Sequence, residues 1–208
     1  MFTQKLTTIC QPSLLALAVS GVAHAQYDDP NATNSIAFDL DRSPGIVQAG
    51  CLPYAAGSVV VTSQGPVEVM DIAVDGLPKN VVLDVFVIQV PNPPFGLSWY
   101  QGDLETDANG HGEEQFIGRF SKETFVVALG VAASPVVHRD PFTDADKNPK
   151  TDPVHTYHIG LWFDSPYDAS AAGCPDSVTP FNGEHNAGVQ VLNTSSFDDL
   201  AGPLFQLE

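Results

Sequence analysis

The sequence has very few basic residues. Its 208 residues include 8 Lys and Arg against 25 Asp and Glu, which gives a formal net charge of −17. A surface so rich in carboxylates repels phosphate backbones, and this argues against nucleic-acid binding. It also disfavours anionic membranes and polyanionic substrates, and favours cations or neutral sugars as ligands. Solubility alone is the other explanation of this charge.

Long hydrophobic runs are scarce, and the one near the start predicts an export signal. Lys5 is the only charged residue before Asp28, and an apolar stretch then leads to the small-x-small cleavage site at 23–25. We expect a signal peptide over 1–25 and a secreted or periplasmic chain. No later stretch is apolar enough to span a membrane. Residues 26–208 are long enough for one domain with a hydrophobic core.

Cysteine is also rare, with three in the chain. Loss of Cys10 with the signal peptide leaves Cys51 and Cys174. An even number of cysteines in an exported protein predicts one disulfide, which closes a long loop. A pair of free buried thiols is the alternative.

Motifs of common enzymes are missing. The sequence contains no Gly-x-Ser-x-Gly, phosphate loop, Cys-x-x-Cys or dinucleotide fingerprint. Acid pairs such as Asp103 with Glu105 leave a carboxylate-dependent hydrolase open, although 25 acids produce some pairs by chance.

Turn-forming residues are abundant, with 17 prolines and 17 glycines spread along the chain. This punctuation favours many short strands. Met70, Ile72 and Val74 alternate with more polar residues, as in a half-buried strand. The fold prediction is an all-β, immunoglobulin-like antiparallel β-sandwich. The expected strands, rich in valine, isoleucine and phenylalanine, are 35–40, 58–62, 67–74, 81–90, 96–100, 113–120, 123–129, 155–163 and 188–193.

Two local signals refine this prediction. Asn109-Gly110 lies between two strand-like runs and predicts the turn of a β-hairpin. One short helix is expected near 166–172, with Ser165 as its N-cap, Pro166 as its first residue and Gly173 as its stop. No internal repeat is evident.

Two motifs carry a resemblance. "GLPKNVVLDVFVIQV" followed by "GDLETDANGHG" is similar to a pattern of exported bacterial immunoglobulin-like β-sandwich modules, over about residues 75–120. "HTYHIGLWFDSP" and "TPFNGEHNAG" resemble a family of secreted bacterial proteins that has no activity to transfer. The resemblance therefore implies a fold and an exported location, and it assigns no functional residue.

Histidines are the first candidate ligands for a metal. His155 and His158 are three apart, so in a regular strand they point to opposite faces and at most one of them joins a given site. We expect His138, His158 and His185 to be the ligands of a zinc or copper ion, with His155 as the substitute for His158. Gly160 beside His158 leaves room for another group to approach. The alternative is a buried, hydrogen-bonded histidine and exposed loop histidines.

An acidic stretch is the second candidate metal site. Oxygen ligands at alternate positions are what calcium needs. Proline and histidine replace the glycine and glutamate of the helix-loop-helix pattern, so the match is partial, and a solvated acidic loop is the alternative. The four expected calcium ligands are Asp144, Asp146, Asn148 and Asp152.

Aromatic residues in "PNPPFGLSWYQGD" are the candidate site for an organic ligand. Phe95, Trp99 and Tyr100 could stack on a neutral glycan. The alternative is that they belong to the core. The leading functional expectation is an exported, non-enzymatic module for extracellular binding or structure, with glycan or metal as its ligand. A histidine-ligated metal enzyme or metal carrier is the first alternative, and a carboxylate-dependent glycan hydrolase is the second.

Overall fold

The computed structural model describes residues 34–121, 125–126 and 153–207, and they form a mostly antiparallel β protein. The strands are β1 (Ser35–Arg42), β2 (Ala56–Gln64), β3 (Val67–Asp75), β4 (Val82–Ile88), β5 (Ser98–Glu105), β6 (Gly112–Gly118), β7 (Phe125–Val126), β8 (Pro153–Val154), β9 (His158–Phe163) and β10 (Gln190–Asn193). The helices are α1 (Pro44–Ala49), α2 (Pro166–Ala171) and the 3-10 helix η1 (Pro203–Leu207). The all-β prediction is confirmed.

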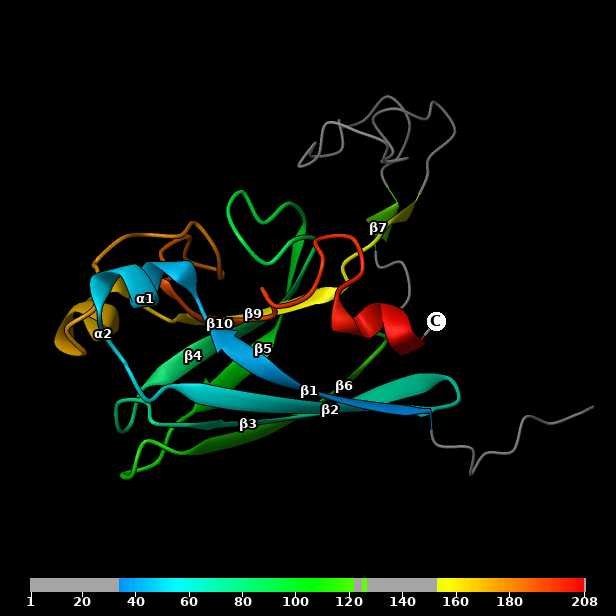
Figure 1. The fold of residues 1–208 in the computed structure, drawn as a ribbon, viewed down its shortest axis with the longest axis horizontal. Helices are drawn as coiled ribbons and strands as arrows, with labels where there is room; N and C mark the ends of the chain where they lie inside the picture. Colours follow the sequence, from blue (N-terminus) through cyan, green and yellow to red (C-terminus); the bar gives the residue numbers. More distant parts are fainter. Residues whose placement is uncertain (1–33, 122–124, 127–152, 208) are drawn as a thin grey trace, which may run out of the picture.

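Eight strands form one continuous sheet in the order β5-β4-β9-β10-β1-β2-β3-β6 (Figure 1). β1 pairs with β2 through Leu40 and then with β10 at Asp41 and Arg42, so it joins two four-stranded halves. The outermost strands β5 and β6 also lie in contact, and Phe116 of β6 packs over Gly102 of β5. The sheet is therefore nearly closed, like a barrel. The finer immunoglobulin-like topology stays a prediction.

Alternation of side chains places the core between the two halves. In β3, Met70, Ile72 and Val74 are all buried, as their spacing predicts. β9 is buried on both faces. Its residues Ile159, Leu161 and Phe163 enter the main core, whereas Trp162 belongs to a second, aromatic cluster on the outer face.

Two sequence-based expectations need correction. The expected strand 155–163 is shorter than predicted, because β9 begins at His158 and the chain at 155–157 is not in a strand. The expected hairpin is also wrong, since β5 pairs with β4 and β6 pairs with β3. The turn at Asn109-Gly110 instead carries the chain from one half of the sheet to the other.

The turn at Asn109-Gly110 is held in place by the Gly-Leu-Pro segment at 76–78, which belongs to the immunoglobulin-like sequence pattern. The Leu77 amide donates to the Gly110 carbonyl at 3.3 Å, and the Thr106 hydroxyl donates to the Pro78 carbonyl at 2.7 Å. Gly110 has a φ of 81°, and a β-carbon there would lie 2.0 Å from the Leu77 oxygen. The two quoted motifs therefore form one structural unit, and only glycine fits where they meet.

The two short helices α1 and α2 both begin with a serine N-cap followed by proline, but the sequence predicted only α2. α2 has the expected N-cap, because the Ser165 hydroxyl accepts from the Asp168 amide at 3.2 Å. α1 was missed, although Ser43 caps it and Pro44 begins it in the same way. The segments "SPGIVQAGC" and "SPYDASAAGC" each follow a strand and end in Gly-Cys, which is an internal repeat that the sequence analysis missed.

The predicted disulfide is present and joins the ends of this repeat. Cys51 follows α1 and Cys174 follows α2, and their Cα atoms are 5.4 Å apart. Figure 1 shows the two helices at the same end of the molecule. Within the described residues, no helix has the length and apolar character needed to cross a membrane.

We predict that loss of this disulfide lowers the free energy of unfolding by about 4–5 kcal/mol, because the bridge closes a loop with a sequence separation of 123. Urea unfolding of the oxidised protein and of a Cys51→Ser/Cys174→Ser variant measures the difference. A difference below about 1 kcal/mol contradicts the prediction.

Candidate functional site

An uncharged groove of about 460 Å³ lies beside α1 and the aromatic cluster. This volume is within the usual range for small-molecule sites. None of the described residues that line it is charged, in a chain of net charge −17. The lining comes from α1 and its cap, the loop after β4, the segment after Cys174, and β10 with the residue before it: Ser43, Pro44, Gly45, Gln48, Pro93, Pro94, Phe95, Ser177, Val178, Thr179, Pro180, Phe181, Val189 and Gln190.

A cluster of four aromatic rings forms the apolar part of this groove and packs behind it. Phe95 and Phe181 line it, with ring centroids 5.5 Å apart, and both pack on the fully buried Trp162 at 5.1 and 5.0 Å. Phe86 of β4 completes the cluster, 5.5 Å from Trp162. Contacts of this kind between rings fix their orientation. The apolar part of the groove is therefore preformed.

Amide side chains of β10 hold the loop that carries Phe95. Gln190 and Asn193 both donate to the Pro91 carbonyl, at 3.2 and 3.0 Å, and Asn193 also donates to the Gln190 side-chain oxygen at 3.0 Å. Ser43 at the start of α1 donates through its hydroxyl to the Gln190 carbonyl. One buried network thus connects three of the groove's walls.

Three buried polar atoms near this loop have no hydrogen-bond partner among the described residues. They are Asn92 Oδ1, Ser98 Oγ and the indole nitrogen of Trp162. Buried polar atoms in folded proteins are nearly always paired with protein or water. All three atoms lie near the Phe95 loop or in the Trp162 cluster, so this side of the molecule has polar atoms that can still form hydrogen bonds.

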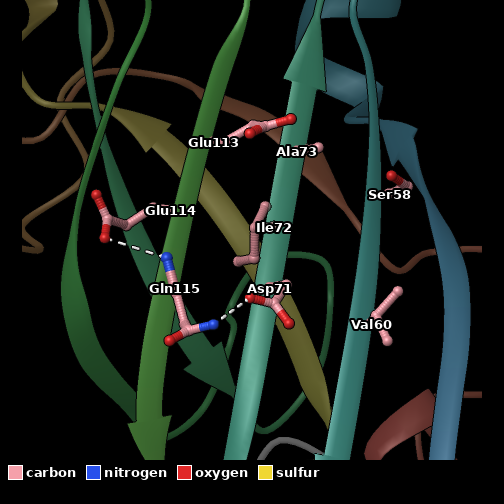
Figure 2. Close-up of a pocket in the computed structure, with 8 residues that line it drawn as sticks. All are labelled: Ser58, Val60, Asp71, Ile72, Ala73, Glu113, Glu114 and Gln115. Atoms are coloured by element: carbon pink, nitrogen blue, oxygen red, sulfur yellow. Dashed lines mark hydrogen bonds between the residues drawn. The ribbon is translucent and has the colours of Figure 1, made fainter.

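A second hollow, of about 410 Å³, lies on the outer face of β2, β3 and β6. Figure 2 shows Gln115 between two carboxylates: it donates to Asp71 at 2.7 Å through its side chain and to Glu114 at 3.1 Å through its backbone. Glu113 also lines this hollow. Its acidic lining suits a cation rather than a neutral molecule.

A buried carboxylate occupies the outer face of β4. Asp84 is 1% exposed and accepts a hydrogen bond from Asn182 at 3.2 Å. Burial and then the nearby charge of Asp164 raise its pKa to about 6, and Asp103 on the paired strand adds to the shift. Tyr100 donates to Asp103 at 2.5 Å. A buried acid among like charges is typical of functional sites.

We predict that Asp84→Asn stabilises the protein by about 1–3 kcal/mol at pH 7. Folded Asp84 keeps its proton up to about pH 6, whereas an unfolded aspartate loses it near pH 4. Between pH 4 and pH 6 the folded state therefore binds more protons than the unfolded state. The free energy of unfolding falls as pH rises through that window because of Asp84. Urea unfolding between pH 4 and 7 measures this, with the exposed Asp176→Asn as control. The prediction is contradicted if the free energy of unfolding depends on pH in the same way for Asp84→Asn and the wild type.

The three candidate aromatic residues lie in different surroundings. Phe95 lines the groove and is partly buried in the aromatic cluster. Tyr100 is 43% exposed and contacts Phe86 at 5.4 Å, near the carboxylates. Trp99 pairs with Val87 and points to the opposite face of β5 from Tyr100. The ligand-binding prediction for Trp99 and Tyr100 stays a prediction.

His158 is fully buried, and both of its ring nitrogens have partners. Nε2 donates to the Asp198 carbonyl at 3.2 Å, so Nδ1 accepts from the Thr194 hydroxyl at 2.8 Å. Burial lowers the pKa of His158, which keeps the ring neutral. The space beside Gly160 is filled by the Trp162 ring. As a metal ligand, His158 would have to give up one of these hydrogen bonds.

The other candidate ligands do not meet His158 among the described residues. The His155 ring stacks on Tyr157 at 4.8 Å, and His185 lies in an exposed turn with a φ of 59°. No group of three His, Cys, Asp or Glu suited to a metal occurs in the described part of the chain. Outside the described residues lie His138, the predicted calcium ligands Asp144, Asp146, Asn148 and Asp152, and the predicted signal peptide 1–25.

We predict that His158→Ala lowers the free energy of unfolding by about 2–4 kcal/mol, because it leaves a cavity and unpairs buried partners. The wild type should also lose stability as pH falls below about 6.5, where the unfolded histidine gains a proton that the folded one resists. Urea unfolding between pH 5 and 8 measures both effects. His185→Asn is the control, since asparagine tolerates positive φ. An equal effect of the two substitutions contradicts a structural role for His158.

Comparisons with protein-family models, curated proteins and solved structures give no match to this chain. The functional assignment therefore depends on the geometry of the site.

Several residues of the groove were missed by the sequence analysis. Phe181 lies in "TPFNGEHNAG", a motif that was noted but not predicted to line a groove. Gln48 was missed together with α1, whose Ser-Pro start and Gly end could have revealed it. Gln190 sits in an expected strand, and its pairing with the Pro91 carbonyl depends on a contact across 99 residues.

Proposed function

We propose that this chain is an exported, non-enzymatic binding module for a neutral carbohydrate, and that the uncharged groove is its site. The observation that carries the proposal is the absence of charge from the groove's described lining in a protein with so many carboxylates. A neutral ligand needs no ion pair, and here it avoids the cost of placing a charge near apolar rings.

The chemistry of the lining supports a sugar in particular. Sugar-binding sites combine apolar faces with a few polar groups that fix orientation. Phe95 and Phe181 supply the rings, and the exposed side chains of Gln48 and Ser177 supply hydrogen-bond donors and acceptors. The predicted signal peptide, the single domain and the immunoglobulin-like β-sandwich complete this proposal.

A carboxylate-dependent glycan hydrolase is the second candidate. It is favoured by Asp84, since a carboxyl group with a pKa of about 6 is suited to act as a general acid near neutral pH. Release of reducing ends from a bound glycan, lost in Asp84→Asn, would favour it over simple binding. The histidine-metal alternative depends on His138 and would require stoichiometric metal in the purified protein.

We predict that Ser177→Trp reduces the affinity for a neutral oligosaccharide at least tenfold, because the indole fills the groove. A panel of neutral glycans identifies a ligand, and calorimetry with that ligand compares the variants. Ser58→Trp is the matched control: Ser58 is also exposed, but lines the other hollow. Gln48→Ala should lose about 3- to 10-fold, the value of one hydrogen bond.

Two results would contradict the proposal. One is that no neutral glycan binds to the wild type. The other is that Ser177→Trp binds with wild-type affinity while Ser58→Trp does not, which would move the site to the face of β2, β3 and β6.

A further inference from the structure

Two walls of the groove lead directly into the disulfide. α1 carries Gln48 on one wall and ends two residues before Cys51. On the other wall, Ser177 and Val178 follow Cys174 within four residues. Because the two cysteine Cα atoms are 5.4 Å apart, the bridge fixes one end of each wall relative to the other.

Little else fixes the wall after Cys174. Among the described residues, no backbone hydrogen bond involves the stretch from Pro175 to Val178. The next anchor is Thr179, whose amide donates to the Ala187 carbonyl at 2.8 Å and whose hydroxyl donates to the Gly188 carbonyl at 3.0 Å. The stretch is thus held at its two ends, and Cys174 is one of them.

The sheet itself has anchors of its own. Continuous ladders join β2 to β3 and β4 to β9, and neither includes a cysteine. α1 is attached to the sheet at its first turn, where the Ser43 amide donates to the Val191 carbonyl at 2.9 Å. Its far end reaches the second wall through Cys51. Loss of the bridge therefore acts first on the spacing of the walls.

From this arrangement we infer that the Cys51–Cys174 disulfide is a positioning element of the ligand groove, beyond its contribution to stability. The inference rests on the proposed carbohydrate site. The bridge sets the separation between α1 and residues 175–178. This separation in turn determines the affinity of the groove for its ligand.

Calorimetry with the neutral oligosaccharide tests this inference. The Cys51→Ser/Cys174→Ser variant should bind at least tenfold more weakly at a temperature well below its melting point. Met70→Ala is the matched control, because it destabilises the core of β3 and keeps the bridge and the groove. Its affinity should equal that of the wild type. Equal affinity of the cysteine variant and the wild type would overturn the inference.

Amide hydrogen exchange gives a second test that needs no ligand. Without the bridge, exchange should accelerate at the hydrogen-bonded amides of both walls, while the amides of β2 and β3 keep their protection. The amides that report the two walls are those of Val47, Gly50, Thr179 and Phe181. If the variant does not fold, wild-type protein reduced by a phosphine serves instead. Acceleration that is uniform across the chain would overturn the inference, whether or not a glycan binds. Absence of glycan binding with local acceleration would count against the proposed function alone.

Discussion

The change of partner in β1 is the constraint on which the rest of the structure depends. Between Leu40 and Asp41 the strand leaves β2 and pairs with β10, so two four-stranded halves become one sheet. The chain then passes through Ser43 into α1 and reaches Cys51. The same short segment therefore closes the core and places one wall of the groove. The Ser43 hydroxyl donates to the Gln190 carbonyl, which connects the α1 wall to β10. The side chain of Gln190 in turn holds the loop that carries Phe95.

Charge is distributed unevenly around this frame. Carboxylates gather around Asp84 on the outer face of β4 and in the hollow of β2, β3 and β6, whereas the described lining of the groove has none. Cations are attracted to the first two places by long-range electrostatics, but a neutral molecule is not. The proposed recognition of a carbohydrate in the groove therefore depends on ring contacts and hydrogen bonds, which act at short range and suit ligands with hydroxyl groups.

The sequence predicted what local rules control. Alternation located β3, Ser165 and Pro166 predicted α2, and the cysteine count predicted the bridge. The hairpin at Asn109-Gly110 was wrong because strand pairing is a long-range choice that a turn signal does not decide. The groove could be predicted only in part for the same reason, because its walls come from distant parts of the sequence: Gln48 and Ser177 are 129 residues apart (177 − 48). Phe95 was found as an aromatic residue in a loop, and its partner Phe181 was not.

Backbone amide shifts measured by NMR during titration with a neutral oligosaccharide test the central claim most directly, because they report the contact surface without any substitution. We predict that the largest shifts occur at Gln48, Ser177 and Val178. They should be smaller at Asp71 and Gln115, in the hollow of Figure 2. Shifts centred on Asp71 and Gln115, or around Asp84, would contradict the assignment of the ligand site to the uncharged groove.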